Sequence, residues 1–299
     1  MQSISRMMLG IILLNWNNTP ATTKCVLSLR TWRKIKPLVY VVNNGSADED
    51  LHFSEDSEVP VFLIQSPGNL GYAGGNNRGI RMAIEDGCEY VLLLNNDASV
   101  GESELVKMLD MLEGNLDIGC IGPEIHEGNR VYLGGRNIGF HVNTRNTRKW
   151  NRSGKTVLWV SYIPGMVFLA RRDAIKKIGC LDETFFFSGE IADFCLRAIG
   201  CGYKCAVCTV ARAEHEPDKD HPLRRTLYQY YSLRNRFLFI RKHYPGMRWI
   251  MEPFWILWGV QRYIRAFIKG QEQESDAYRM GIMDGLKGRY GDRNELFLL

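Results

Sequence analysis

The sequence lacks a long apolar run. Its apolar stretches, such as residues 254–260 and 90–94, are far shorter than the ~20 residues that cross a bilayer as a helix. No segment is therefore expected to span a membrane. With 45% hydrophobic and 24% charged residues among 299, the composition also excludes a mostly disordered or collagen-like chain. This length allows one large domain with an appendage, or two domains of ordinary size.

The eight cysteines do not follow the spacings of a disulfide framework, and a chain of this length does not need one. The first residues of the sequence resemble a signal peptide only weakly. Arg6 precedes the apolar residues 7–14, but an Asn-rich segment follows at 15–18 where small cleavage-site residues would stand. We therefore expect a buried first strand and a cytoplasmic protein.

Three apolar runs each end in an Asn-rich cluster. IILL is followed by NWNN, LVYVV by NNGS, and YVLLL by NNDA. Fully apolar runs indicate strands that are covered on both faces. The stretch after the first run opens like a helix, with Thr19 as a cap and Pro20 in the first turn. Alternating strands and helices predict an α/β fold with a mostly parallel sheet, whose ligands bind beyond the carboxyl ends of the strands, where the Asn clusters fall.

Further elements are expected along the chain. We predict helices near 102–112, 171–178 and 190–199, a strand near 204–210, and short strands or hairpins within 124–162. After His221 and Pro222 the pattern becomes helical up to about residue 290. We place a boundary at residue 245, which gives a main domain over 1–245 and a C-terminal helical extension over 246–299.

The basic excess lies in the C-terminal part. Residues 222–299 hold 14 Lys and Arg against 7 Asp and Glu, whereas residues 1–221 hold 24 against 26. Aromatic residues lie among these basic ones, at positions 249, 254, 255, 258, 263 and 267. Two interpretations stay open: packing on the core or in a homodimer, or peripheral contact with an anionic membrane on its inner face.

A Gly-rich segment opens a predicted helix at residues 69–79, with the sequence NLGYAGGNNRG. Closely spaced glycines let backbone amides approach a phosphate. The segment matches neither GxGxxG nor GxxxxGK[ST], so the dinucleotide and Walker-type interpretations lose their main support. A simple Gly-rich turn is the alternative.

Asp97 follows the third apolar run and is a candidate ligand of a divalent cation. One carboxylate suffices only if substrate phosphates supply other oxygens. Alternatively, Asp97 caps the next helix or closes a turn. His215, just past the predicted 204–210 strand, is either a metal or phosphate ligand or a solvated loop histidine. Zinc binding by Cys201, Cys205 and Cys208 is not favoured, because a second correctly spaced pair is missing and strand packing explains these residues.

Glu190 and Asp193 lie three residues apart among aromatic residues, and both are candidate general bases. A carboxylate beside bulky apolar groups can have a raised pKa that suits base catalysis. Alternatively, acids in a first helical turn stabilise the helix dipole, and Asp193 can pair with Arg197.

Five segments in order resemble the inverting family-2 glycosyltransferases of GT-A fold, particularly their rhamnosyltransferase-like branch. They are VVNNGSADED, NLGYAGGNNRGI, LLLNNDA, PGMVFLARRDAIKKIGCLDETFFF and YYSLRNRFLFIRKHY. The likeness covers roughly residues 8–245. It implies a nucleotide-binding α/β domain whose second half shapes the acceptor site, a nucleoside-diphosphate sugar as donor, and Mg²⁺ or Mn²⁺ as cofactor. It does not imply nucleic-acid binding.

The resemblance also implies roles for individual residues. The residues expected to bind the donor are Asn15, Asn17, Asn43, Asn69, Gly74, Asn76, Asn96 and Arg234. Asp97 and His215 would hold the metal and lie near the diphosphate. Gly165, Asp182 and Glu183 would shape the sugar and acceptor pocket. Asn235 belongs to the same motif as Arg234.

Two positions depart from the family pattern. Many members have Asp where this chain has Asn43, which implies a neutral contact to the nucleotide base of the donor. Many also have Glu-Asp at the motif that supplies the general base, where this chain has Glu190 and Ile191. Because isoleucine cannot take a proton, either Glu190 or Asp193 has the role, or the protein binds a donor without turnover.

The sequence thus predicts an inverting enzyme that transfers a sugar to a saccharide or lipid-linked acceptor. A non-catalytic nucleotide-sugar or glycan-binding module is the first alternative. A nucleotidyltransferase is the second, although NWNNTP stands where such enzymes usually have a Gly-rich loop with Arg and Lys.

Overall fold

A mixed β-sheet forms the centre of the molecule in a computed structural model, which describes residues 8–45, 51–53, 58–135, 156–217 and 224–297. The strands run in the spatial order β3-β2-β1-β4-β9-β6-β10-β5, with β7 paired to β6 and β8 to β10. Their bounds are β1 Leu9–Asn15, β2 Leu38–Asn43, β3 Val61–Gln65, β4 Tyr90–Asn95, β5 Ala98–Val100, β6 Ile118–Glu127, β7 Arg130–Tyr132, β8 Val157–Val160, β9 Val167–Arg171 and β10 Lys204–His215.

The first four strands are parallel, as the alternation of strands and helices predicts. β1 lies between β2 and β4, and β3 pairs with the outer edge of β2. The second half of the sheet is mixed, because β9 runs antiparallel between β4 and β6 while β10 is parallel to β6. The three Asn clusters therefore meet at one edge of the parallel half.

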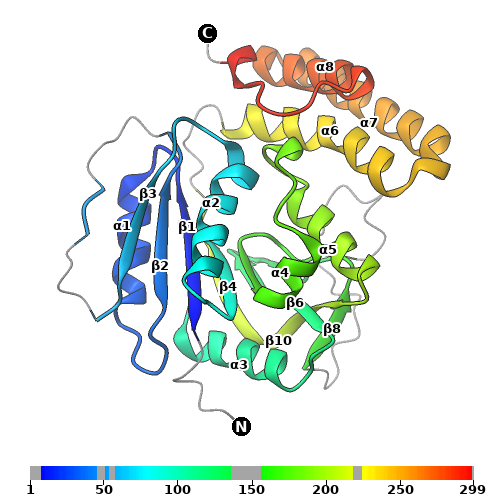
Figure 1. Cartoon of the computed structure of the whole chain (residues 1–299). Helices are drawn as coiled ribbons and strands as arrows, with labels where there is room; N and C mark the ends of the chain where they lie inside the picture. Colours follow the sequence, from blue (N-terminus) through cyan, green and yellow to red (C-terminus); the bar gives the residue numbers. More distant parts are fainter. Residues whose placement is uncertain (1–7, 46–50, 54–57, 136–155, 218–223, 298–299) are drawn as a thin grey trace.

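Helices cover both faces of this sheet (Figure 1). Along β1, Ile11 and Leu13 share a core cluster with residues of α1 and α3, and Ile12 shares another with residues of α2 and α5. This division follows from the period of two in a strand. The helix bounds are α1 Thr19–Leu29, α2 Gly71–Glu85, α3 Glu102–Glu113, α4 Arg172–Ile178 and α5 Glu190–Gly200, with a short 3₁₀ helix, η2, at Glu183–Phe185.

The predicted helices near 102–112, 171–178 and 190–199 are confirmed as α3, α4 and α5. Strands β7 and β8 confirm the short strands expected within 124–162, of which residues 136–155 lie outside the described part. The cap of α1 is Asn18, whose side chain accepts a hydrogen bond from the Ala21 amide, so the prediction of Thr19 as the cap was wrong.

The predicted 204–210 strand continues to His215. A register shift between Cys208 and Arg212 lets β10 stay paired with β6, and its last residues pair with β5. His215 is therefore a strand residue opposite Ala98, with 9% of its surface exposed, and the solvated-loop interpretation is wrong.

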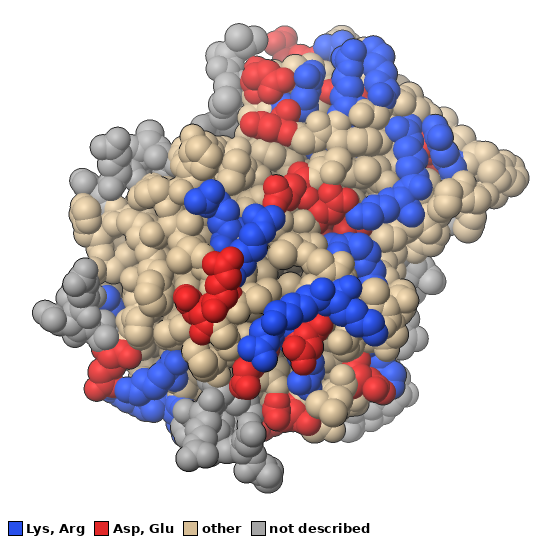
Figure 2. Space-filling view, viewed as in Figure 1, with Lys and Arg blue, Asp and Glu red and all other residues tan. Residues whose placement is uncertain are grey.

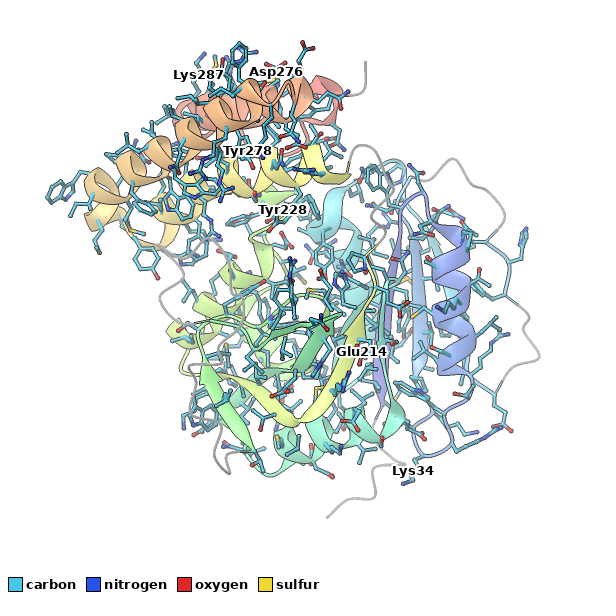
Figure 3. All side chains as sticks on the ribbon, turned by 180° about the vertical axis from the view of Figure 1, so that it is seen from behind. Lys34, Glu214, Tyr228, Asp276, Tyr278 and Lys287 are labelled. Atoms are coloured by element: carbon cyan, nitrogen blue, oxygen red, sulfur yellow. The ribbon has the colours of Figure 1, made fainter. Side chains whose placement is uncertain are left out.

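Three further helices form a layer at one end of the sheet: α6 Arg224–His243, α7 Arg248–Ile268 and α8 Glu272–Lys287, with 3₁₀ helices η3 Pro245–Met247 and η4 Asn294–Leu296. The helices approach closely because glycines face large side chains. A Cβ atom at Gly285 of α8 would lie 2.3 Å from the Phe237 ring of α6. Tyr228 and Tyr278 lie within this layer, whereas Asp276 and Lys287 point away from it (Figure 3).

The boundary predicted at residue 245 falls on η3, between α6 and α7. It stays a prediction, although α6, which precedes it, packs on both α7 and α8. Among the described helices, none is long and apolar enough to cross a membrane.

Candidate functional site

A cavity of about 180 Å³ lies at the carboxyl ends of the parallel strands. Its floor comes from the ends of β1 and β4, and its opposite wall from the η2–α5 turn, α6 and η4. The lining residues are Leu14, Trp16, Asn18, Asn44, Asn69, Gly71, Tyr72, Asn95, Asn96, Asp97, Phe186, Phe187, Leu227, Tyr231 and Asn294. The cavity thus combines amides and one carboxylate on the floor with aromatic rings above them.

Asn44 holds the Gly-rich segment against the floor. Its side-chain oxygen accepts from the Leu70 amide at 3.0 Å, and its nitrogen donates to the Asn69 side chain at 3.0 Å and to the Gly71 carbonyl at 3.1 Å. Gly71 has φ +70°, and a Cβ atom there would lie 2.3 Å from the Phe186 carbonyl oxygen. Only glycine fits this position, where α2 begins beside the aromatic wall.

Among the residues predicted to bind a donor, Asn69 and Asn96 line this cavity, and the other six do not. Asn15 accepts from Thr22 at 2.8 Å and donates to Asn43 at 3.4 Å, and Asn43 donates to Gln65 at 3.0 Å. These amides form a buried layer beneath the floor.

The remaining predicted donor residues also lie outside the lining. Asn76 donates to the Tyr72 carbonyl within α2 at 2.8 Å, and Gly74 faces the Glu183 carboxylate. Asn17 is exposed and has a left-handed backbone with φ 51°.

The two predicted metal ligands lie next to each other. His215 Nε2 is 3.3 Å from Asp97 Oδ1, and both side chains are 9% exposed. The pairing of β10 with β5 brings them together, and the Glu216 amide donates to the Asp97 carbonyl at 2.8 Å. On the other side of the ring, His215 Nδ1 is 3.2 Å from Glu127 Oε2. Glu127 thus orients the imidazole, a role that the sequence did not predict.

A carboxylate oxygen and an imidazole nitrogen that face each other fit a divalent cation such as Mn²⁺ or Mg²⁺. Among the described residues, a set of three thiols is the only cluster of three or more potential metal ligands. Asp97 and His215 would therefore form a two-ligand site. The remaining coordination positions would then fall to phosphate oxygens and water.

Glu190 is the first residue of α5 and is 6% exposed. Its Oε2 atom is buried without a hydrogen-bond partner among the described residues. Burial, with a smaller effect of the Asp193 charge, raises the pKa of Glu190 from 4.5 to about 7. Glu190 follows Phe187, which lines the cavity, by three residues, so α5 begins beside the aromatic wall.

Asp193 has a different environment. Its carboxylate receives His243 Nε2 at 2.7 Å, Lys242 Nζ at 2.7 Å and Arg197 Nε at 2.8 Å, and its side chain has no exposed surface. Burial alone would raise its pKa, but the hydrogen bonds from His243 and Lys242 and the charge of Arg197 lower the pKa to about 2. Asp193 therefore links α5 to the end of α6.

The turn before Glu190 is held by Arg234 and Asn235 on α6. In this turn Phe186, Ser188 and Gly189 have positive φ values of 61°, 72° and 108°. Asn235 donates to the carbonyls of residues 185, 187 and 188 at 2.8, 2.9 and 2.6 Å, and Arg234 donates to the carbonyl of residue 185 at 3.1 Å. Arg234 is fully buried and is not among the cavity-lining residues.

The residues expected to shape the acceptor pocket also make intramolecular contacts. Asp182 accepts from the Thr184 amide at 2.9 Å and from Lys242 at 2.7 Å. Glu183 accepts from Asn77 and Arg81, both at 2.9 Å. Gly165 accepts from the Tyr72 hydroxyl at 2.9 Å, and a Cβ atom there would lie 3.0 Å from Ile191. Ile191, where the family often has Asp, is thus a core residue beneath Gly165.

Several cavity residues were not predicted from the sequence. They are Trp16, Asn18, Asn44, Phe186, Phe187, Leu227, Tyr231 and Asn294. Asn18 and Asn44 lie in the Asn-rich clusters that end the first two apolar runs. Asn294 gives no signal in the sequence, because only the return of the C-terminal segment to α6 brings it to the cavity.

Six of the eight cysteines are buried, whereas Cys180 and Cys201 are partly exposed. Cys205 and Cys208 point to opposite faces of the sheet and belong to different core clusters. Cys205 lies near Cys120 and Cys195, with its sulfur 3.3 Å from that of Cys120. The CxxC spacing of Cys205 and Cys208 therefore reflects strand packing, as expected. Cys201 caps the end of α5 and lies outside β10, so the expectation of strand packing was wrong for this residue.

Comparison with known proteins agrees with this geometry. The family described as Glycosyl transferase family 2 matches residues 11–179. A low-salt glycan biosynthesis hexosyltransferase of Haloferax volcanii is 30% identical over 212 residues, which are 66% of this chain and 65% of that protein, just under two thirds of its length. The N-acetylglucosaminyl-diphospho-decaprenol L-rhamnosyltransferase of Mycobacterium tuberculosis is 25% identical over 262 residues, 78% of this chain and 83% of that protein.

A solved structure shows the fold. The mannosyltransferase of Pyrobaculum calidifontis, in complex with GDP-Man and Mn²⁺, superposes with a TM-score of 0.60 over 95% of this chain and 88% of that one, at 12% identity. The chain therefore has the GT-A fold, as the sequence predicted.

Proposed function

The chain belongs to glycosyltransferase family 2, and from this premise we propose that it transfers a sugar from a nucleoside-diphosphate donor to a hydroxyl group of a saccharide or lipid-linked acceptor. The transfer inverts the configuration of the anomeric carbon. The proposal rests on one observation above all: a buried carboxyl whose pKa is raised to about 7 lies beside a cavity that carries Asp97 on its floor.

Glu190 acts as the general base in this proposal. The acceptor oxygen forms a bond to the anomeric carbon, the bond from that carbon to the diphosphate oxygen breaks, and the acceptor proton goes to Glu190. A pKa near the working pH suits this role, because the group must be ionised before the reaction and must hold the proton after it. Asp193 is unsuitable, since Arg197, Lys242 and His243 already hold its carboxylate.

The floor of the cavity binds the donor. Asn44 and Asn69 fix the start of α2, and Asn96 and Asp97 face the same space. Asp97 and His215 would hold Mg²⁺ or Mn²⁺, which when bound supplies positive charge for the leaving diphosphate. Asn43 supports Asn15 from behind, so a neutral residue at this position is compatible with donor binding.

Arg234 and Asn235 are positioning residues. They hold the carbonyls of the turn that precedes Glu190, and this turn also carries the aromatic wall of the cavity. The acceptor is proposed to be lipid-linked because a relative that matches 78% of this chain is named for a decaprenol-linked acceptor.

The test is to incubate the purified full-length chain with a panel of nucleotide sugars, with and without Mn²⁺, and to measure release of the nucleoside diphosphate. Slow hydrolysis or transfer from at least one donor is expected, and Glu190→Gln should slow it by about 10²–10⁴-fold. If calorimetry shows that a donor binds but neither protein turns it over, the chain is a binding module and the proposed enzyme activity is wrong.

A further inference from the structure

Helix α7 turns an apolar face away from the protein. Its inner face packs through Met251, Trp255, Gly259 and Ala266, all of which are buried. The exposed side chains recur every three or four residues and so share the opposite face. They are Trp249, Ile250, Phe254, Leu257, Val260, Ile264, Phe267 and Ile268, with Trp249 75%, Leu257 72% and Ile268 77% exposed.

This face carries no exposed charge between residues 249 and 264. The two charged residues in that stretch are both turned away from it. Glu252 is buried and accepts from Arg241 and Arg248, each at 2.8 Å, and Arg262 lies 5.0 Å from the centre of the Trp258 ring. Figure 2 shows that the projecting end of the three-helix layer is mostly uncharged. An exposed apolar face of this extent marks an interaction site.

Basic residues border the apolar face. Arg248 lies at the start of α7, and Arg265 and Lys269 lie at its end, all exposed. The helix contains one acidic residue, Glu252, which is buried between arginines. A second copy of α7 would therefore offer no exposed carboxylate to these cations, whereas anionic lipid headgroups would.

We propose that α7 lies in the headgroup region of an anionic membrane, with the face defined above in contact with the acyl chains. Apolar and aromatic residues on one face, bordered by Arg and Lys, are typical of helices that lie in the plane of an interface. At 1.5 Å per residue, the 21 residues of α7 give a contact about 30 Å long.

The proposed membrane contact extends the proposed function. It rests on that function for its biological purpose, but the contact itself can form whether or not the protein transfers a sugar. Helix α6 packs on α7 and α8, and the same helix supplies Leu227 and Tyr231 to the cavity wall. A membrane bound at α7 therefore faces the helical layer that closes the cavity, which suits an acceptor carried on a lipid.

The experiment is flotation of the full-length chain with phosphatidylcholine vesicles, with and without phosphatidylglycerol. The protein should float with the anionic vesicles at low ionic strength, and binding should weaken at about 1 M salt, where the Debye length is about 3 Å. A double variant, Leu257→Glu with Ile264→Glu, should lower partitioning by at least about tenfold, because two apolar side chains lose their burial in lipid.

The matched control is Leu116→Glu with Leu27→Glu. Leu116 is 73% exposed and Leu27 55%, close to the 72% of Leu257 and the 47% of Ile264, but neither lies on α7. The control should float like the unchanged protein. Absence of flotation at low salt, or equal flotation of the α7 variant, would overturn the proposal. A dimer that does not float, and that the α7 variant converts to a monomer in sedimentation, would identify a second copy as the partner instead.

No donor or acceptor is present in the flotation assay, so its result is independent of sugar transfer. Nucleotide release measured in solution should be the same for the α7 variant and the unchanged protein. Loss of that release in both proteins would count against the proposed function and not against the docking.

Discussion

Glu190 and Asp193 lie three residues apart at the start of α5, yet their carboxyl groups have opposite environments. Asp193 is held by His243, Lys242 and Arg197, whereas Glu190 Oε2 is buried without a hydrogen-bond partner among the described residues. The first turn of α5 therefore holds two carboxyls in different states. Asp193 stabilises the fold through its ion pairs, and Glu190 keeps a proton-accepting atom that the proposed mechanism uses.

The first prediction concerns turnover. Glu190→Gln keeps the size of the side chain but cannot accept a proton, so kcat should fall by about 10²–10⁴-fold, the usual contribution of a general base. Donor affinity should change little, because Glu190 is not among the residues that line the cavity. Steady-state kinetics and calorimetry measure the two quantities. A variant with unchanged kcat would remove Glu190 from the mechanism.

The second prediction concerns pH. Because the base must be ionised, kcat/KM should rise as the pH increases through about 7 and then level off. The same carboxyl makes the fold less stable at high pH. Its pKa is about 7 in the folded state and 4.5 when unperturbed, so its contribution is fully present below 4.5 and is lost as the pH rises through about 7.

Glu190→Gln should lack this loss. The quantity to compare is the free energy of unfolding of the variant minus that of the unchanged protein. This difference should be about 3 kcal/mol larger at pH 8 than at pH 5. Urea denaturation at the two pH values measures the difference. An equal effect at both would mean that Glu190 is not buried as described.

The third prediction concerns Asp193. Asp193→Asn should lower the free energy of unfolding by about 3 kcal/mol near neutral pH, because it leaves Arg197 and Lys242 without the carboxylate that they share. The pKa of this group is lowered from 3.8 to about 2, so its stabilising effect is present above 3.8 and is lost as the pH falls through about 2.

A matched control for this variant is Asp117→Asn. The ion pair of Asp117 with Lys204 is exposed, with 65% of the Asp117 side chain accessible, and its loss should cost less than about 1 kcal/mol. If Asp193→Asn folds as stably as the control and yet loses more activity than Glu190→Gln, the roles assigned to the two carboxyls are reversed.

The sequence predicted the parallel half of the sheet well, for a physical reason. Strands β1, β2 and β4 are buried on both faces, so they are continuous apolar runs in the sequence. The polar residues at their carboxyl ends indicate the edge of the sheet where ligands bind. The antiparallel insertion of β9 was not predicted, because the sequence of a buried five-residue strand does not indicate whether it runs parallel or antiparallel to its neighbours. The extension of β10 to His215 was missed because a register shift interrupts its pattern.

The site was predicted less completely than the fold. Asp97 and His215 were identified as possible metal ligands, and they lie together. Asn43 and Arg234 were expected to contact the donor, but they lie outside the cavity lining. Sequence motifs locate the elements around a site, whereas the direction of each side chain depends on packing from distant segments, such as α6 and η4.

The fourth prediction concerns the metal. Asp97→Asn should weaken Mn²⁺-dependent donor binding by more than about tenfold, because an amide oxygen is a poorer ligand for a hard cation than a carboxylate. Asp110→Asn, an exposed position on α3, is the control and should bind the donor normally. Calorimetry with and without Mn²⁺ measures the effect. Equal metal dependence in both variants would contradict the assignment of Asp97.

The fifth prediction concerns the C-terminal wall of the cavity. The Tyr231 hydroxyl donates to Asn294 at 2.9 Å and accepts from the Arg293 amide at 2.9 Å, so it attaches the segment before η4 to α6. Tyr231→Phe removes these two hydrogen bonds and keeps the ring. At about 1 kcal/mol for each net hydrogen bond, the segment should open more often, and donor affinity should fall by up to about 30-fold.

Tyr228→Phe is the control for this variant, because Tyr228 lies on the same helix but is 49% exposed and is not among the cavity-lining residues. It should leave donor affinity unchanged. Hydrogen exchange should rise in residues 291–297 of Tyr231→Phe and not in the control, since local opening exposes the amides of this segment. Faster exchange with unchanged donor affinity would show that the segment covers the cavity without contributing to donor binding. Unchanged exchange would mean that other contacts, such as the 2.7 Å bond from Arg234 to the Gly291 carbonyl, suffice to hold the wall.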